Sequence, residues 1–217
     1  MEQIIYLALG CIIAYLLGSF SSSVWLGKWI YNIDVREYGS KNAGATNTIR
    51  VLGTKIGVLV LFLDALKAWG AVMIASLLAK PYLNDNQIII YKIAVGVIAV
   101  LGHVFPLYTN FKGGKGVASI VGVIIALYHP LIFLLVLLTF VIIFILSRYV
   151  SLGSIISSFV FAILAVFVFP ETNFYLKILA IFIAVFIPLT HHKNIKRLLN
   201  GTENKLSFKK KEITTKN

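Results

Sequence analysis

The chain has 217 residues, of which 59% are apolar and 13% are charged. Globular chains carry roughly 25% charged residues, and a soluble core of this size cannot hide so much apolar surface. The composition therefore excludes a soluble domain and predicts a membrane protein. The formal net charge is +12. In a membrane protein such an excess of cations sets topology, so nucleic acid is not expected as a partner. The single cysteine, Cys11, offers no disulfide and no cysteine zinc cluster.

Apolar runs predict seven transmembrane helices in an all-α integral membrane protein. In chain order, the runs cover residues 3–24, 56–79, 88–107, 117–128, 131–147, 149–169 and 174–190. They are continuous rather than alternating, which favours helices over the strands of a closed barrel. A helix crosses the membrane with about 20 residues, so 117–128 is short. Pro130 leaves open a single kinked span over 117–147, which would give six helices and place both termini on one side.

The distribution of Lys and Arg favours seven spans. Sixteen of them lie on alternate connections, namely loop 25–55, loop 102–116, Arg148 and the tail after residue 190. Three lie on the opposite connections, namely Lys80, Lys92 and Lys177. Because cytoplasmic loops carry the excess of Lys and Arg, we expect the N-terminus outside the cell and the C-terminus in the cytoplasm.

The end of the chain is basic and contains Lys209-Lys210-Lys211. Such a segment is typical of a solvated tail near anionic lipid headgroups. No internal repeat divides the rest of the chain. We therefore expect a single membrane domain over residues 1–206 and a basic cytoplasmic tail over 207–217.

The first polar segment, residues 36–50, lies on the predicted cytoplasmic side and is rich in glycine and neutral donors. Its Ser, Thr and Asn side chains supply neutral hydrogen-bond donors, and Arg50 supplies a planar fork suited to phosphate. The alternative is a solvated loop whose cations only set topology.

The second segment, residues 111–116, reads FKGGKG and directly precedes the fourth apolar run. Gly113 and Gly114 can expose amide N–H groups at a helix N-terminus, where the helix dipole favours an anion, and Lys112 and Lys115 add charge. It is not a Walker A motif, because Gly116 replaces the Ser or Thr. The alternative is a glycine hinge whose lysines extend to the membrane surface.

The third segment, residues 191–197, follows the last run. His191 and Asn194 are three residues apart and share a helix face. Adjacent histidines point apart and no carboxylate cluster accompanies them, so we expect no metal and no cofactor. The alternative is the ordinary charged end of a span.

The second apolar run contains Asp64 and Lys67, which are three residues apart. A lone charge in hydrocarbon costs roughly 2.5–3.5 kcal/mol or more, so we expect the two to form an ion pair that faces the bundle. His103, at the end of the third run, is expected to be a buried, hydrogen-bonded histidine.

Three cationic, donor-rich segments on one membrane face predict a site for a phosphorylated, anionic substrate at the lipid interface. Together they resemble the bacterial acyl-phosphate:glycerol-3-phosphate acyltransferases (the PlsY family) from Gly18 to about Leu206. The motifs are GSKNAGATN (39–47) with Arg50, LDALK (63–67), GHVFPLYTNFKGGKGVAS (102–119), RYVSLGS (148–154) and HHKNIKRLLNGTE (191–203).

The resemblance implies transfer of a fatty acyl group from acyl phosphate to the sn-1 hydroxyl of glycerol 3-phosphate. The product would be lysophosphatidic acid, in the first step of bacterial phospholipid synthesis. It also implies a seven-helix fold in the bacterial cell membrane, with the active site facing the cytoplasm. Membrane lipids are expected partners, and the enzyme that forms acyl phosphate is a candidate partner.

The resemblance also implies roles for single residues. The implied catalytic residues are His191, Ser40, Arg50 and Lys115. The implied substrate-binding residues are Asn42, Asn47, Gly113, Gly114 and Asn194. Arg50, Lys115 and the glycine amides would bind phosphate, while the other residues would orient glycerol 3-phosphate. His192 stands where the family usually has arginine.

The chain lacks the His-x4-Asp pair of acyltransferases that use acyl-CoA or acyl-carrier protein. Acyl phosphate is a mixed anhydride with a good leaving group, so positioning and charge neutralisation can suffice. Alignment of two bound reactants can supply roughly 7–11 kcal/mol of the barrier. Either a substrate phosphate oxygen or His191 could accept the hydroxyl proton.

Three other functions remain as alternatives. A transporter for a phosphorylated metabolite would place its site near the bilayer midplane, between repeats. A CDP-alcohol phosphotransferase would need several metal-binding aspartates on one helix, whereas Asp64 is the acid carried inside a span. A structural membrane subunit would leave the donor-rich loops unexplained.

Overall fold

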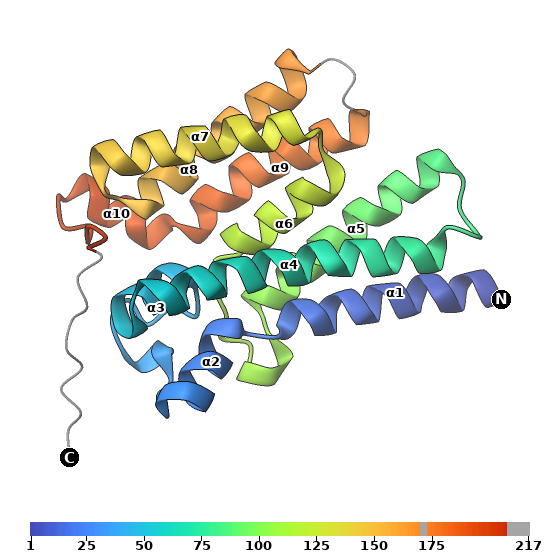
Figure 1. The fold of residues 1–217 in the computed structure, drawn as a ribbon. Helices are drawn as coiled ribbons and strands as arrows, with labels where there is room; N and C mark the ends of the chain where they lie inside the picture. Colours follow the sequence, from blue (N-terminus) through green and yellow to red (C-terminus); the bar gives the residue numbers. More distant parts are fainter. Residues whose placement is uncertain (170–172, 208–217) are drawn as a thin grey trace.

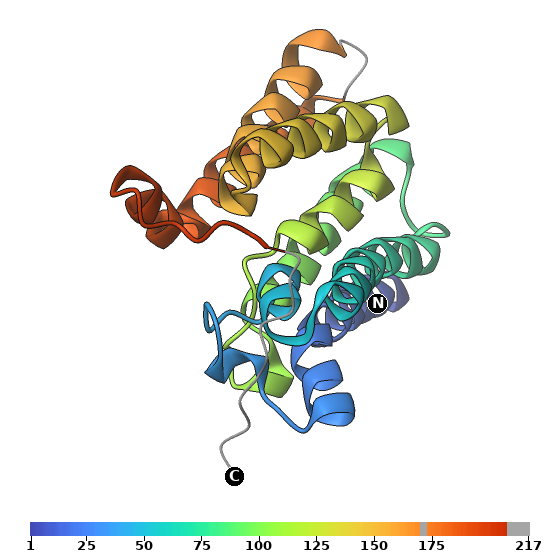
Figure 2. The ribbon, with the colours of Figure 1, turned by 60° about the vertical axis from the view of Figure 1, so that its left-hand side comes forward.

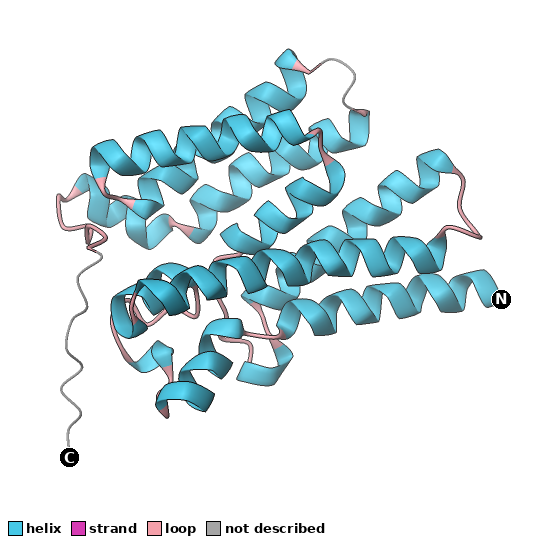
Figure 3. Cartoon of the chain, viewed as in Figure 1, coloured by secondary structure: helices cyan, strands magenta, loops and turns pink. Residues whose placement is uncertain are grey.

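The computed structural model describes residues 1–169 and 173–207, and all regular structure within them is helical (Figure 3). The α-helices are α1 (Glu2–Ser19), α2 (Ser22–Tyr31), α3 (Ala45–Leu52), α4 (Thr54–Ala79), α5 (Asp85–Val104), α6 (Val117–Leu127), α7 (Pro130–Ser147), α8 (Val150–Ile163), α9 (Phe174–Thr190) and α10 (His192–Leu199). Two 3₁₀ turns, η1 (Val35–Glu37) and η2 (Leu107–Thr109), and one π-helical segment, η3 (Leu164–Val168), complete the list. The predicted basic tail lies outside the described residues, apart from Ser207.

Each of the seven apolar runs contains a helix, as predicted, but their lengths differ. Five helical segments are long and apolar enough to cross a membrane, and they begin at Glu2, Thr54, Asp85, Pro130 and Val150. The pair α9 and α10, bent by 63°, would be a sixth span. Helix α6 has 11 residues, well short of the roughly 20 residues that a membrane crossing needs. By length and composition, the described residues therefore hold five or six candidate spans.

The helices form two groups joined by α6. Helix α1 packs against α4 and α5, and α7, α8 and α9 form the second group (Figure 1). Helix α6 contacts α4 and α5 on one side and α7 and α9 on the other, as the turned view also shows (Figure 2). Because its neighbours cover α6, this short helix does not have to meet lipid along a full span.

The first predicted run, 3–24, is wrong at its C-terminal end, because α1 stops at Ser19 and α2 begins separately at Ser22. Phe20 is extended between them, with φ −68° and ψ 107°. Its carbonyl accepts a hydrogen bond from Lys67 Nζ at 2.6 Å, and the Ser22 hydroxyl donates to Asp64 Oδ1 at 3.0 Å. Charged groups on α4 thus hold the break in the helix.

The alternative of one kinked span over 117–147 is not what the structure contains. Tyr128 is extended and ends α6, and His129 Nδ1 accepts from the Leu131 amide at 3.2 Å to cap α7. Pro130 occupies the first turn of α7, where its missing N–H costs nothing. Helices α6 and α7 are therefore separate.

The predicted ion pair inside α4 is confirmed. Lys67 Nζ lies 2.9 Å from Asp64 Oδ1, and both side chains are buried. His103, also buried as predicted, places its Nδ1 3.1 Å from Lys67 Nζ. These three groups satisfy one another next to the packed small residues of α1, α4 and α5.

Candidate active site

A cavity of about 370 Å³ brings the three polar segments together at one end of the bundle. Its walls come from the loop before α3, from α3, α4, the end of α5, the start of α6, α7, the start of α8, the junction of α9 and α10, and the segment after α10. Seven of the nine predicted site residues line it, namely Ser40, Asn42, Asn47, Arg50, Lys115, His191 and Asn194. Gly113 and Gly114 do not belong to the lining.

The buried side chain of Asn47 binds backbone groups of the first polar segment and of the turn before it. The residue is 2% exposed, and its Nδ2 donates to the Val35 and Tyr38 carbonyls at 2.7 and 3.2 Å. Its Oδ1 accepts from the Ser40 amide at 2.8 Å. The implied role for Asn47 was to orient a substrate, but both ends of its amide bind backbone. In this arrangement the side chain holds Ser40, which is exposed, at the cavity.

The glycine segment differs from the expectation that its amides face a phosphate. The Gly114 amide donates to the His103 carbonyl at 3.2 Å, and a Cβ at Gly113 would collide with that same carbonyl. A Cβ at Gly114 would collide with the His103 ring. The two glycines therefore let the segment pack against the end of α5.

The helix N-terminus that meets the cavity begins two residues later. Gly116 caps α6 with φ 84°, and Gly116, Val117 and Ala118 line the cavity beside Lys115. The first amides of a helix have no partner within it and attract anions. The helix end whose free amides suit an anion is thus formed by residues 116–118 rather than by Gly113 and Gly114.

A chain of hydrogen bonds sets the orientation of Asn194. Lys115 Nζ donates to Asn194 Oδ1, and Asn194 Nδ2 donates to Glu203 Oε1 at 2.6 Å. Glu203 is 8% exposed and also accepts from Ser151 Oγ at 2.9 Å and from Arg197 Nε at 2.6 Å. Since the carboxylate can only accept, the Asn194 oxygen is turned toward Lys115.

Sequence reasoning did not name Glu203 or Ser151 as site residues, although both line the cavity. Glu203 is an acid within a basic C-terminal segment, and that contrast is the signal that could have found it. Ser151 carries no comparable signal. Asp64 and His103, interpreted as structural groups, also line the cavity.

Cations dominate the electrostatics of the cavity. Burial lowers the pKa of Lys115 to about 8; the nearby Glu203 carboxylate opposes this shift, whereas Arg197 and Arg50 add to it. Burial also lowers the pKa of Arg50. For Glu203, burial would raise the pKa, but hydrogen bonds from Asn194, Arg197 and Ser151 outweigh it and lower the pKa. The cavity lining therefore carries more cations than its two acids, Asp64 and Glu203, can neutralise, which suits an anionic ligand.

His191 lies at the bend between α9 and α10, three residues after Pro188, which lies inside α9. His191 is 3% exposed, and its Nδ1 lies 2.8 Å from the Ile187 carbonyl oxygen. A carbonyl oxygen can only accept, so Nδ1 carries the proton, and Nε2 of the neutral ring is an acceptor. This tautomer can accept a hydrogen bond from a hydroxyl group in the cavity.

Within the part of the chain that the structure describes, no three His, Cys, Asp or Glu side chains gather as candidate metal ligands. The acids and histidines of the cavity are instead held by lysine, arginine, serine and backbone groups.

Comparisons with known proteins place this chain among its relatives. The family model of glycerol-3-phosphate acyltransferase matches residues 8–201. A glycerol-3-phosphate acyltransferase from Fusobacterium nucleatum is 44% identical over 197 residues, covering 91% of this chain and 96% of that protein. One from Enterococcus faecalis is 42% identical over 204 residues, covering 91% and 90%.

Two solved structures also match, and both cover 93% of this chain and 96% of theirs. Both are crystal structures of PlsY, described as an integral membrane glycerol 3-phosphate acyltransferase. The glycerol 3-phosphate form has a TM-score of 0.82 and 37% identity, and the lysophosphatidic acid form has a TM-score of 0.79 and 36% identity. With a family model over most of its length and relatives above 40% identity, this all-helical membrane chain belongs to the glycerol-3-phosphate acyltransferase family.

Proposed function

We propose that this protein transfers a fatty acyl group from acyl phosphate to the sn-1 hydroxyl of glycerol 3-phosphate. The products are lysophosphatidic acid and inorganic phosphate. The observation that carries the proposal is the cationic cavity, which collects seven implied site residues in a chain of this family. The related PlsY structures are described as a glycerol 3-phosphate form and a lysophosphatidic acid form, which correspond to a substrate and a product of this reaction.

In the proposed reaction the sn-1 hydroxyl oxygen attacks the acyl carbonyl carbon, and the bond from that carbon to the phosphate oxygen breaks. Phosphate leaves with the electron pair. Arg50, Lys115 and the first amides of α6 stabilise phosphate charge, and Ser40 and Asn194 orient glycerol 3-phosphate. The hydroxyl proton passes to a substrate phosphate oxygen or to His191 Nε2. Because the donor is already activated, positioning in the cavity supplies most of the rate enhancement.

We also propose seven spans, with the N-terminus outside and the site facing the cytoplasm of a bacterial cell. The charge distribution supports this orientation. Helices α3 and α10, which border the cavity, lie at one end of the bundle, and the N-terminus and the turn between α4 and α5 lie at the other (Figure 1). Residues 1–206 would form one domain, and 207–217 a tail near anionic lipid.

The test is to offer palmitoyl phosphate and palmitoyl-CoA separately, each with glycerol 3-phosphate, to the purified protein. We expect lysophosphatidic acid from palmitoyl phosphate and little or none from palmitoyl-CoA, because the His-x4-Asp pair is missing. Mass spectrometry of the lipid product gives the result. Strong turnover with palmitoyl-CoA alone would overturn the proposed donor. Uptake of glycerol 3-phosphate into sealed vesicles without a lipid product would favour a transporter.

The pKa of Lys115 makes a further prediction about pH. The lysine is charged below about pH 8 and neutral above it, so kcat/KM for glycerol 3-phosphate should decrease as pH rises through that value. The variant Lys115→Arg keeps its charge across this range and should lose this decrease, even if its overall rate is lower. The measurement is kcat/KM against pH, which reports groups of the free enzyme. If kcat/KM of Lys115→Arg decreases at high pH as it does in the wild type, a group other than Lys115 causes the decrease.

A further inference from the structure

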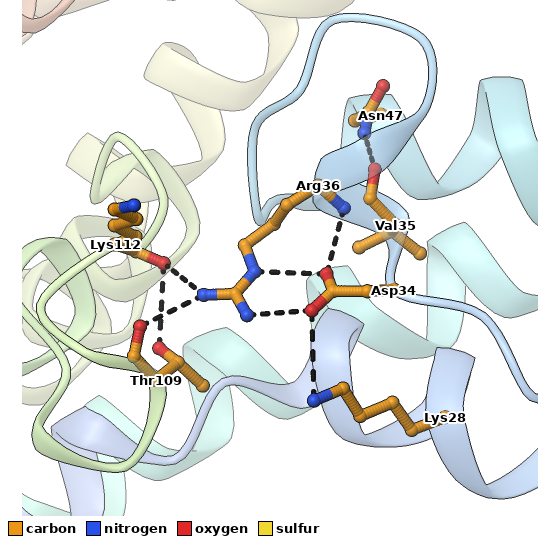
Figure 4. Close-up of polar contacts among 7 residues, drawn as sticks. All are labelled: Lys28, Asp34, Val35, Arg36, Asn47, Thr109 and Lys112. Atoms are coloured by element: carbon orange, nitrogen blue, oxygen red, sulfur yellow. Dashed lines mark hydrogen bonds and ion pairs between the residues drawn. The ribbon is translucent and has the colours of Figure 1, made fainter.

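Two loops border the cavity from neighbouring positions, and one side chain joins them. The first loop comprises residues 32–44, before α3, and the glycine loop comprises residues 105–116, between α5 and α6. Arg36 of the first loop donates from Nη1 to the Thr109 carbonyl at 2.9 Å and to the Lys112 carbonyl at 3.2 Å, both in the glycine loop (Figure 4). Arg36 itself does not line the cavity.

Asp34 fixes the plane of the Arg36 guanidinium. Nε and Nη2 of Arg36 lie 2.9 and 2.7 Å from the two carboxylate oxygens of Asp34, which is the bidentate arrangement. Asp34 Oδ1 also accepts from the Arg36 amide at 3.0 Å. With two nitrogens held in this way, the third is directed at the glycine loop, as Figure 4 shows.

The part of the glycine loop that Arg36 binds has an unusual backbone. Asn110 and Phe111 have φ of 55° and 58°, in the left-handed region that residues other than glycine rarely adopt. Thr109 and Lys112, whose carbonyls accept from Arg36, flank this pair. The guanidinium therefore holds both ends of a strained turn three residues before Lys115.

On the other side of Arg36, polar contacts continue through Asn47 to Ser40, within the first polar segment. The Val35 carbonyl accepts from Asn47 Nδ2 at 2.7 Å, and Asn47 Oδ1 accepts from the Ser40 amide at 2.8 Å. Polar contacts thus run from the turn before Lys115, through Arg36 and Asn47, to Ser40. Both Ser40 and Lys115 line the cavity.

We propose that Arg36 is a positioning residue, which joins the first loop to the glycine loop so that Ser40 and Lys115 face one bound substrate together. The inference rests on the proposed function, because it assumes that the cavity binds glycerol 3-phosphate. The bridge consists of the hydrogen bonds from Arg36 to the Thr109 and Lys112 carbonyls. Without it, the two loops spend a smaller fraction of the time in the arrangement that binds substrate. Apparent affinity decreases by that fraction, whereas saturating substrate restores the arrangement.

The experiment compares Arg36→Ala, Arg36→Lys and a control, Lys28→Ala. Lys28 of α2 also pairs with Asp34, at 3.7 Å, but takes no part in the bridge.

Both Arg36 variants should raise KM for glycerol 3-phosphate about tenfold, with kcat changed less than about threefold, as loss of charge-assisted bonds predicts. Arg36→Lys should not restore the wild-type KM, because a single ammonium cannot bind a carboxylate bidentately and also reach two carbonyls. Lys28→Ala should remain within about twofold of wild type, since an exposed ion pair contributes little.

Gel filtration in detergent checks that each variant is folded, and if Arg36→Ala fails this check, Arg36→Lys decides. An unchanged KM in a folded Arg36→Lys protein would overturn the proposal. So would a loss confined to kcat, or an equal KM defect in Lys28→Ala, which would point to the charge of Asp34 instead. If the wild-type protein makes no lysophosphatidic acid, the proposed function fails. If it does and the Arg36 variants keep a normal KM, only the proposed role of Arg36 fails.

Discussion

Replacing Arg50 by alanine should lower kcat/KM by about ten- to hundredfold, because one charge-assisted hydrogen bond to phosphate is worth about 1.5–3 kcal/mol. Arg50 is half-buried, lines the cavity, and donates from Nη2 to the Asn204 carbonyl at 3.1 Å. Burial lowers its pKa, but a guanidinium starts so high that it remains charged. The measurement is kcat/KM for both substrates.

Arg50→Lys should fail nearly as badly as Arg50→Ala. A guanidinium can donate two parallel N–H groups to a phosphate while another of its N–H groups binds the Asn204 carbonyl. The single nitrogen of an ammonium cannot do both. Lys112→Ala is the control, because this lysine is exposed on the glycine loop and does not line the cavity; its rate should stay near wild type. Near wild-type kinetics in Arg50→Ala would remove this residue from the site.

Replacing Asp64 by alanine should lower the free energy of unfolding by about 3–5 kcal/mol, because it leaves a buried charge without its partner. Asp64 Oδ1 lies 2.9 Å from Lys67 Nζ and 3.0 Å from Ser22 Oγ. Without this carboxylate, Lys67 would remain buried with only the Phe20 carbonyl and His103 nearby. Thermal unfolding in detergent measures the loss.

A double variant separates two effects of Asp64→Ala, namely the loss of the ion pair and the unpaired charge that remains on Lys67. Replacing a buried ion pair by apolar residues of similar size is often neutral, so Asp64→Leu with Lys67→Met should be more stable than Asp64→Ala alone. A double variant that is less stable than Asp64→Ala would show that the carboxylate contributes mainly through Ser22 and the break between α1 and α2.

The sequence by itself determined the features that depend on local composition and spacing. Long apolar runs located the seven apolar helices, because hydrophobic length is a property of consecutive residues. The spacing of Asp64 and Lys67 predicted their ion pair, since residues three apart share a helix face. The small donors and cations of three segments indicated an anion site, and the family resemblance of these segments implied nine site residues, seven of which line one cavity.

Only the tertiary structure decided the features that depend on residues far apart in the chain. Helix α1 ends early because Phe20 and Ser22 bind charged groups more than 40 residues away. The Gly114 amide binds His103 instead of facing the cavity. Arg36 reaches carbonyls 73 and 76 residues further along the chain. The spacing of residues in the sequence cannot predict such contacts, because the tertiary fold brings these groups within hydrogen-bond distance. Burial then decides which polar groups must find partners inside the protein.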